Sequence, residues 1–191
     1  MLLRKASRDD AAAIARVNVD TWRSAFAGII SDSYLANLSY EGREQDFKEL
    51  LGQSEELSFA YVVENQQGEI IGFAIGGKDR EGIRPQGGEI YALYVSEAWQ
   101  KQGVGRMLVQ AAANHLYQLK VPSLVLWTLA AGSANGFYKT MGGDLIIMKV
   151  FTIADQDVVF AVYGWDNIHT LLGNYFPNSP VKLDTCPNKE G

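Results

Sequence analysis

Two glycines stand where a strand-like pattern gives way to a helical one, in the stretch "YALYVSEAWQKQGVGRMLVQAA" of residues 91–112. Glycine is costly inside a helix, so Gly103 and Gly105 at the start of one need a reason. The first N–H groups of a helix have no partner within it, and the helix dipole adds positive charge there. Because glycine has no Cβ, an anion can approach these groups closely. The junction therefore predicts a phosphate or pyrophosphate site, unless the glycines serve only the turn and close packing.

Two common phosphate-binding motifs do not match this stretch of sequence. The dinucleotide pattern G-x-G-x-x-G fails because Leu108 occupies the third glycine position, and no Lys-Ser or Lys-Thr follows a glycine as a P-loop requires. The preceding strands also read as a hairpin rather than as βαβ units. Lys101 and Arg106 could add charge to a phosphate site, or they could be solvated charges without a ligand.

The stretch Gln100–Gly105 fits the pattern Q/R-x-x-G-x-G/A, which opens the long helix of the GNAT superfamily of acyl-CoA N-acyltransferases. Downstream, "FYKTMGG" with Phe137 and Tyr138 is similar to that family's F-Y-x-x-x-G-[FG]. With the order of elements, the chain resembles the superfamily over about residues 2–165. The segment "TWRSAFAGII" is similar to the W-R-x-x-[YF]-x-G-I motif of one bacterial branch.

The resemblance implies an α/β chain with a GNAT-like fold, whose mixed, mostly antiparallel sheet of six to seven strands has helices on both faces. It implies an acetyltransferase that moves an acetyl group from acetyl-CoA to an amine, by direct attack in a ternary complex and without a metal. The acceptor could be a small molecule or a protein N-terminus. A cysteine nucleophile is not expected, because Cys186 lies near the end of the chain.

The resemblance also implies where the coenzyme would bind. Its pyrophosphate would lie against the N–H groups of residues 101–106, its pantetheine arm beside the preceding strand, and its thioester oxygen would accept from Leu93 N–H. The family's Asn before the F-Y pair is missing, since Ala131 and Gly132 stand there, and Asn135 is a substitute out of register. The predicted coenzyme-binding residues are Leu93, Tyr94, Val95, Gln100, Lys101, Gln102, Gly103, Val104, Gly105, Arg106 and Asn135.

Two catalytic residues follow from the same resemblance. Tyr138 matches the tyrosine beside the coenzyme sulfur, and a phenol with a pKa near ~10 can donate a proton at neutral pH. Glu89 opens the central strand and would act as the base, directly or through water. Strict alternation would place Glu89 on one face with Tyr91, Leu93 and Val95. The alternatives are a packed core aromatic for Tyr138 and a solvent-exposed strand end for Glu89.

The acceptor cleft would have one wall built by the first two helices, with Trp22, Arg23, Phe26 and Tyr34. Tyr91 and Tyr94 could orient the acceptor or water. An arginine beside a tryptophan suits a carboxylate or a planar polar acceptor. Trp22 and Phe26 could instead be core anchors and Arg23 a surface charge. The sequence therefore does not identify the acceptor.

The elements that position these residues can be read from periodicity and turn residues. In chain order, the sequence predicts a strand over 2–7, a helix from Ser7 to Gly28, a short helix around 34–38, a helical stretch over 41–56, hairpin strands over 57–65 and 69–77, a loop over 79–88, a strand over 89–95, a long helix over 103–119, a strand over 123–129, a short helix over 133–143 and two strands between 145 and 165. Together with the resemblance to the GNAT superfamily, they imply a GNAT-like acetyltransferase domain over 1–165. Residues 166–191 are predicted to be a loosely ordered tail that begins with the pattern of a helical turn.

Composition limits the partners. The chain has 191 residues, 47% of them hydrophobic, which suits one domain, and its net charge of −5 argues against nucleic acid or an anionic membrane as a general partner. The single cysteine and the absence of any apolar run of ~18 to 20 residues favour a cytoplasmic protein without a membrane span. His115 and His169 lack the spacing of zinc ligands.

Two rival functions remain open at this point. One is a GNAT-like module that binds acyl-CoA as a sensor without turning it over, and the other is a nucleotide-binding protein that uses the same glycines. Paired C-terminal strands in relatives also allow a homodimer, by analogy alone.

Overall fold

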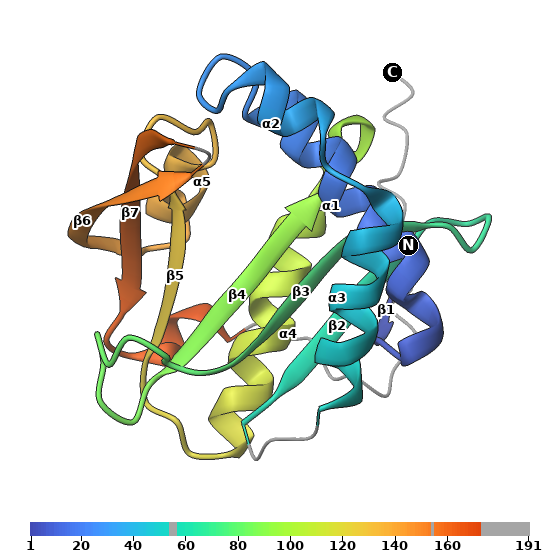
Figure 1. Cartoon of the computed structure of the whole chain (residues 1–191). Helices are drawn as coiled ribbons and strands as arrows, with labels where there is room; N and C mark the ends of the chain where they lie inside the picture. The colour runs from blue at the N-terminus through green and yellow to red at the C-terminus, as the bar shows by residue number, and fades with distance from the viewer. Residues whose placement is uncertain (54–56, 154, 173–191) are drawn as a thin grey trace, which may run out of the picture.

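The computed structural model describes residues 1–53, 57–153 and 155–172, and the described residues form one seven-stranded sheet with helices on both faces (Figure 1). The strands are β1 (Leu2–Lys5), β2 (Phe59–Glu64), β3 (Ile70–Lys78), β4 (Gly88–Val95), β5 (Leu124–Leu129), β6 (Asp144–Ile153) and β7 (Gln156–Trp165). The helices are α1 (Ala11–Ala25), α2 (Asp32–Ala36), α3 (Tyr40–Gly52), α4 (Val104–Gln118) and α5 (Asn135–Thr140), with 3₁₀ turns η1 (Arg8–Asp10), η2 (Glu97–Trp99) and η3 (Ile168–Leu171).

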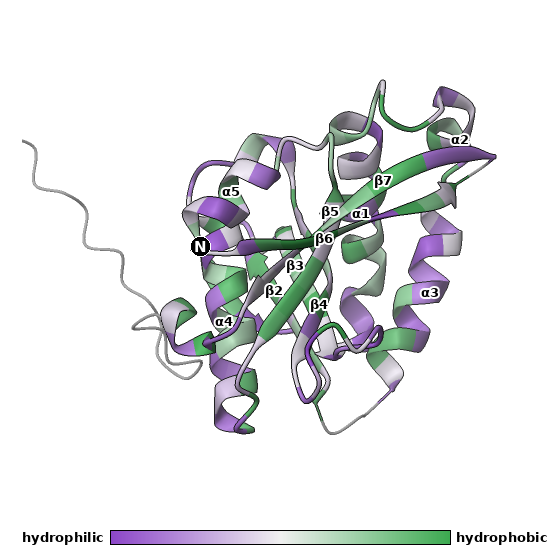
Figure 2. Cartoon of the chain, turned by 90° about the vertical axis from the view of Figure 1, so that its left-hand side faces the viewer, coloured by the Kyte–Doolittle hydropathy of each residue, from purple (hydrophilic) through white to green (hydrophobic). Residues whose placement is uncertain are grey.

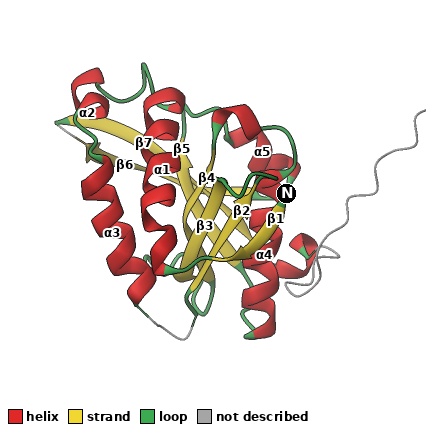
Figure 3. Ribbon diagram, turned by 90° about the vertical axis from the view of Figure 1, so that its right-hand side faces the viewer, coloured by secondary structure: helices red, strands yellow, loops and turns green. Residues whose placement is uncertain are grey.

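The strand order across the sheet is β1-β2-β3-β4-β5-β7-β6. Every neighbouring pair is antiparallel except β4 and β5, which run parallel. Helices α1 and α3 lie on one side of the sheet, and α4 and α5 lie on the other (Figure 3). The predicted mixed, mostly antiparallel sheet is therefore confirmed.

The helices form where an apolar stripe can be buried. On α4, Val104, Leu108, Ala112 and Leu116 recur at helical spacing and are fully buried against the sheet. On the opposite face, α1 and α3 share a second cluster, in which Phe47 of α3 packs edge-on against Phe73 of β3, with ring centroids 5.4 Å apart. Because α4 is anchored along its length, its N-terminal end is held at a fixed place beside β4.

Strands β4 and β5 stay paired for only three residues, from Gly88 opposite Leu124 to Ile90 opposite Leu126, and then diverge (Figure 1). The rest of the β4 edge is left open on that side, while β5 continues in register with β7. A wedge-shaped opening thus forms in the middle of the sheet.

A β-bulge in β4 corrects the predicted alternation of faces. Ile75 of β3 pairs with Ala92 and Gly76 pairs with Ile90, so Tyr91 is the extra residue. Ile90 therefore shares the α4 face with Leu93 and Val95, and Glu89 falls on the opposite face. The prediction that Glu89 lies on one face with Leu93 and Val95 is wrong, because the bulge shifts the phase of the strand.

The packed part of the chain continues past β7. Ile168 and Leu171 of η3 are buried beside α4, and Ile168 N–H donates to Pro122 O at 2.9 Å, so the predicted helical turn is present. Cys186 and the rest of 173–191 lie outside the described residues, and the domain boundary at 165 stays a prediction.

Apolar residues predominate along the outer strand β6 (Figure 2). Leu145, Met148 and Val150 have exposed fractions of 44%, 55% and 60%. Within the described residues, no helix is long and apolar enough to cross a membrane.

Candidate active site

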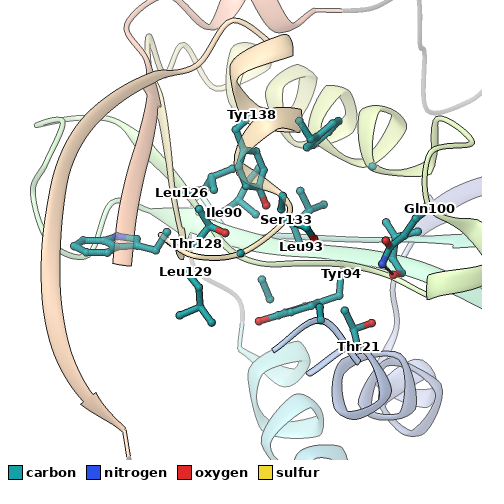
Figure 4. A pocket seen from close by; sticks show the side chains of 18 of the residues that line it. Thr21, Ile90, Leu93, Tyr94, Gln100, Leu126, Thr128, Leu129, Ser133 and Tyr138 are labelled. Carbon is teal, nitrogen blue, oxygen red and sulfur yellow. Dashed lines mark hydrogen bonds between the residues drawn. The ribbon is translucent and has the colours of Figure 1, made fainter. Parts of the chain in front are cut away.

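A cavity of about 640 Å³ occupies the opening between β4 and β5. Its walls come from the end of α1, from β4 and β5, from the turn over 100–106, from the segment over 132–140 and from Phe160 of β7 (Figure 4). The divergence of the two strands therefore brings together segments that are far apart in the sequence.

The two glycines at the start of α4 have different structural reasons. Gly103 is the N-cap with φ +87°, in the left-handed region that favours glycine. At Gly105 an added Cβ would lie 3.4 Å from the Phe137 ring, so this glycine marks close contact between α4 and α5. The first helical hydrogen bond runs from Met107 N–H to Gly103 O, which leaves the N–H groups of residues 104–106 without partners inside the helix. This end of the cavity is suited to an anion.

The residues predicted to bind coenzyme divide into two groups at this turn. Gln100, Lys101, Gly103, Gly105 and Arg106 line the cavity together with Leu93, Tyr94 and Val95 of β4. Val104 is instead buried in the core beneath α4, and the Gln102 side chain donates to Ala98 O at 2.8 Å. The structure therefore brings most of the predicted set together around one cavity.

Tyr138 points from α5 into the cavity toward Thr128 (Figure 4). Its side chain is 5% exposed and packs between Phe137 and Tyr163, with ring centroids at 5.3 and 5.6 Å. Burial raises the pKa of Tyr138 well above the ordinary tyrosine value; the nearby Tyr94 adds to the shift and a side-chain hydrogen bond with Thr128 opposes it. Tyr138 is therefore protonated at neutral pH.

Tyr94 is fixed by the first helix. Trp22 Nε1 donates to the Tyr94 hydroxyl at 2.9 Å, which connects the end of α1 to β4 across the cavity. Burial raises the pKa of Tyr94, while the hydrogen bond from Trp22 and the positive charge of Arg43 oppose the shift. Trp22 also packs edge-on against Phe26 at 5.0 Å, and both rings line the cavity.

Glu89 does not line this cavity, although it is only 1% exposed. It lies where β4 and β5 are still paired, and Arg80 binds both of its oxygens, by Nη2 to Oε1 at 2.5 Å and by the backbone N–H to Oε2 at 3.0 Å. Its neighbour Tyr91 reaches the cavity wall, but the Tyr91 hydroxyl donates to Lys78 O at 2.8 Å and Arg80 stacks on the ring. The solvent-exposed strand end considered for Glu89 is wrong.

Three other predicted site residues have contacts away from the cavity lining. Arg23 donates to Leu35 O at 3.2 Å and to Leu38 O at 2.8 Å, so its guanidinium binds carbonyls at and beyond the end of α2. Tyr34 packs behind Trp22 at 6.2 Å. The Asn135 amide donates to three carbonyls between residues 129 and 132, and so holds the turn before α5.

Several cavity residues were missed by the sequence reasoning. Thr21 lines the cavity from α1, and its buried Oγ1 has no hydrogen-bond partner among the described residues. Thr128 and Trp127 line it from β5, Phe160 from β7 and Ser133 from the turn before α5. A polar residue inside the apolar run "SLVLWTL" was the available signal for Thr128, whereas nothing local distinguishes the others.

Among the described residues, no group of three or more His, Cys, Asp or Glu side chains is gathered as a metal site. The polar groups of the cavity are hydroxyls, amides, backbone N–H groups and two cations at the start of α4. Such a set can bind an anion at one end and hold a proton donor in the middle.

Comparison with known proteins defines the class. The model of the Acetyltransferase (GNAT) family matches residues 22–142. A Bacillus subtilis (strain 168) protein, the uncharacterized N-acetyltransferase YuaI, is 31% identical over 169 residues, which are 88% of this chain and 95% of that protein. The chain therefore belongs to the GNAT family of acetyltransferases.

Solved structures agree on the fold. One is the PaiA N-acetyltransferase of Thermoplasma acidophilum in complex with coenzyme A, with a TM-score of 0.63, 18% identity and coverage of 83% of this chain and 96% of that one. Another is a ribosomal-protein-alanine N-acetyltransferase from Brucella melitensis, with a TM-score of 0.67, 18% identity and coverage of 87% and 99%. At such identity the likeness concerns the fold, and the bacterial branch suggested by the Trp22-Arg23 motif stays a prediction.

Proposed function

We propose that the protein transfers an acetyl group from acetyl-CoA to a primary amine by direct attack in a ternary complex. The observation that carries the proposal is a single cavity with unpaired helix N–H groups and two cations at one end and buried Tyr138 in its middle. The coenzyme A complex of the Thermoplasma acidophilum relative supports acetyl-CoA as the donor.

The residues that would hold the coenzyme follow from the cavity walls. The backbone of residues 103–106, with Lys101 and Arg106, would bind the pyrophosphate, because unpaired N–H groups and positive charge attract a phosphate. The open edge of β4 from Leu93 to Val95 would pair with the amide groups of the pantetheine arm. Asn135 is left out of this set, because its amide already binds the turn before α5.

Tyr138 would donate the proton to the leaving thiolate of coenzyme A. Its raised pKa keeps it protonated at neutral pH, and its packing in α5 fixes the direction of its hydroxyl. A positioned acid of this kind contributes about 10²- to 10⁴-fold to the rate. The backbone N–H of Leu93, two residues beyond the extra residue of the bulge in β4, would stabilise the negative charge on the thioester oxygen.

The predicted base, Glu89, is not carried into this proposal. A base must reach the proton that it removes, and Glu89 is bound by Arg80 outside the cavity lining. Glu89→Gln tests this point: we expect the acid limb of the pH profile of kcat/KM to lie at the same pH as in the wild type. A shift of the acid limb in that variant would restore Glu89 as the base.

The proposed activity is tested by thiol release from acetyl-CoA with a panel of primary amines, followed spectroscopically. The rival function of an acyl-CoA sensor is supported if acetyl-CoA raises the melting temperature but no amine releases thiol. The nucleotide-binding rival is supported if ATP or NAD raises the melting temperature more than acetyl-CoA does, because a ligand stabilises the state that it binds. We expect acetyl-CoA to give the larger shift.

The homodimer stays a prediction. The exposed apolar side chains of edge strand β6 are where a second copy would pack, since an unpaired strand edge can accept another strand. Analytical ultracentrifugation measures the mass in solution. The cytoplasmic location is likewise an expectation from the sequence.

A further inference from the structure

The two ends of the cavity differ sharply in charge. Among the described residues that line it, Lys101 and Arg106 are the charged side chains, and both belong to the start of α4. The end away from α4 is built by the aromatic rings of Trp22, Phe26 and Phe160, together with Trp127. No carboxylate and no imidazole is among these lining residues.

The charged groups around the aromatic end are already paired or lie outside the lining. Arg43 stacks on Trp22, with its guanidinium 5.8 Å from the ring centroid, and Arg23 binds carbonyls after α2. Lys149 lies 5.4 Å from the Trp127 ring centroid and binds Glu81 at 3.0 Å.

The nearby carboxylates are also engaged. Asp20 of α1 accepts from the Tyr40 hydroxyl at 2.6 Å, and Glu89 is bound by Arg80. An acceptor at the aromatic end would therefore meet rings and hydroxyls rather than charged groups.

Such surroundings discriminate between classes of amine. A polyamine cation would lose its hydration there, and no carboxylate of the cavity would replace it. An amino acid would bury its carboxylate there, and no arginine would pair with it. A flat apolar ring would be buried against these four aromatic side chains, which is favourable. The aromatic end thus suits an uncharged aromatic molecule.

The same surroundings leave the amine's proton without an acceptor on the protein. The tyrosines that face the cavity are Tyr91, Tyr94 and Tyr138, and burial raises the pKa of the last two, so neither is a phenolate base at neutral pH. Tyr91 already donates to Lys78 O. Lys101 and Arg106 are cations at the far end. The amine must then arrive already neutral.

We propose that the acceptor is a primary alkylamine that carries an aromatic ring and is taken up from water as its free base. This inference rests on the proposed acetyltransferase function. The amine nitrogen bonds to the thioester carbon, the carbon–sulfur bond breaks, and Tyr138 gives its proton to the leaving sulfur. The new amide nitrogen loses one proton to water, and Tyr138 takes one back from water, so the products are the N-acetyl amine and free coenzyme A.

The test uses two amines of the same shape and different basicity, phenethylamine and its β,β-difluoro analogue, with the purified full chain and saturating acetyl-CoA. For each amine kcat/KM is measured against pH by thiol release. If the protein supplies no base, the acid limb follows the pKa of each amine, and below both pKa values the free-base fraction of the less basic amine is about tenfold larger for every unit by which its pKa is lower. An acid limb at the same pH for both amines would overturn the proposal, because a protein group would then remove the proton.

The acceptor class is tested in parallel with spermidine and glutamate at neutral pH. We expect the aromatic amine to exceed both in kcat/KM by tenfold or more, since tenfold corresponds to only about 1.4 kcal/mol of binding. A faster reaction of spermidine or glutamate would overturn this inference while leaving the acetyltransferase function intact. Thiol release with none of the amines would instead overturn the proposed function and this inference with it.

A carboxylate added to the aromatic end should weaken the preference for the aromatic amine over spermidine. Ala25 lines the cavity at the last position of α1 and is only half-buried, so Ala25→Asp places a charge there with little disturbance, and Ala25→Ser is the matched control. We expect Ala25→Asp to lose about tenfold with phenethylamine relative to spermidine, and Ala25→Ser to keep the wild-type ratio. An unchanged ratio in a folded Ala25→Asp protein would contradict the proposal, and the pH test on the wild-type chain stands if that variant does not fold.

Discussion

Removing one oxygen atom from Tyr138 separates its chemical role from its role in packing. Tyr138→Phe keeps the ring that packs against Phe137 and Tyr163, with centroids at 5.3 and 5.6 Å. The variant loses the hydrogen bond with Thr128, and a bond of this kind contributes about 1 kcal/mol net. We therefore expect a melting temperature about 2 to 4 °C lower and a folded protein.

The effect on catalysis should be much larger. Without the phenol the thiolate leaves unprotonated, and we expect kcat to fall about 10²-fold or more while the affinity for acetyl-CoA stays within about twofold. Thiol-release assays give kcat, and calorimetric titration with acetyl-CoA gives the affinity. Tyr163→Phe is the matched control, since Tyr163 is a buried neighbour of Tyr138 that does not line the cavity.

The pH dependence supplies a second measurement of the same role. Because burial raises the pKa of Tyr138, the donor keeps its proton as the pH rises through the ordinary tyrosine value of about 10. Wild-type kcat should therefore not fall between pH 7 and about pH 10 through loss of this proton. Wild-type turnover in Tyr138→Phe, or an equal loss in Tyr163→Phe, would refute the assignment of Tyr138 as the acid.

Two further predictions concern stability. Gly103→Ala should lower the free energy of unfolding by about 1 to 2 kcal/mol, because φ is +87° at this position, although the added Cβ would meet open space. Gly105→Ala, measured alongside by urea unfolding, should lower it by less. Equal losses in the two variants would contradict the backbone argument. The pKa of Asp10 is lowered to about 2, first by the side-chain hydrogen bond from Arg4, at 2.8 Å. Since this folded-state pKa lies below the unfolded value of about 4, the pair stabilises the fold above about pH 4 and loses that contribution as the pH falls through about 2. Asp10→Asn should thus be on the order of 1 to 2 kcal/mol less stable than wild type at pH 7, with a smaller difference at pH 3, and a difference independent of pH would refute this pairing.

The structural features around the candidate site that the sequence predicted are local. The start of α4 depends on Gly103 and its neighbours in the chain, and a glycine at the start of a helix can be recognised from the sequence alone. The position of Tyr138 on a short helix before Gly142, with φ +78°, is local as well. These features needed no knowledge of the rest of the fold.

The parts that the sequence did not predict depend on distant partners. The bulge that turns Glu89 away from the Leu93 face occurs opposite Gly76 of β3, where a Cβ would collide with the Glu89 carbonyl. The bond from Trp22 to Tyr94 spans 72 residues. Periodicity along one strand carries no information about either contact, so alternation alone placed Glu89 on the wrong face.

Arg23 shows the same limit for a charged side chain. Its neighbour Trp22 made it a candidate for binding the acceptor, but the end of α2 lies within reach and its carbonyls accept from the guanidinium. Helix ends present unpaired carbonyls, and a nearby arginine satisfies them. A charge can therefore serve the fold where the sequence suggests a ligand.

The most direct test of the account is a crystal structure of the full chain with acetyl-CoA. We predict the pyrophosphate against the backbone N–H groups of residues 103–106 and the thioester sulfur within hydrogen-bonding reach of the Tyr138 hydroxyl. Acetyl-CoA bound outside the cavity between β4 and β5, or with its pyrophosphate away from the start of α4, would contradict the account.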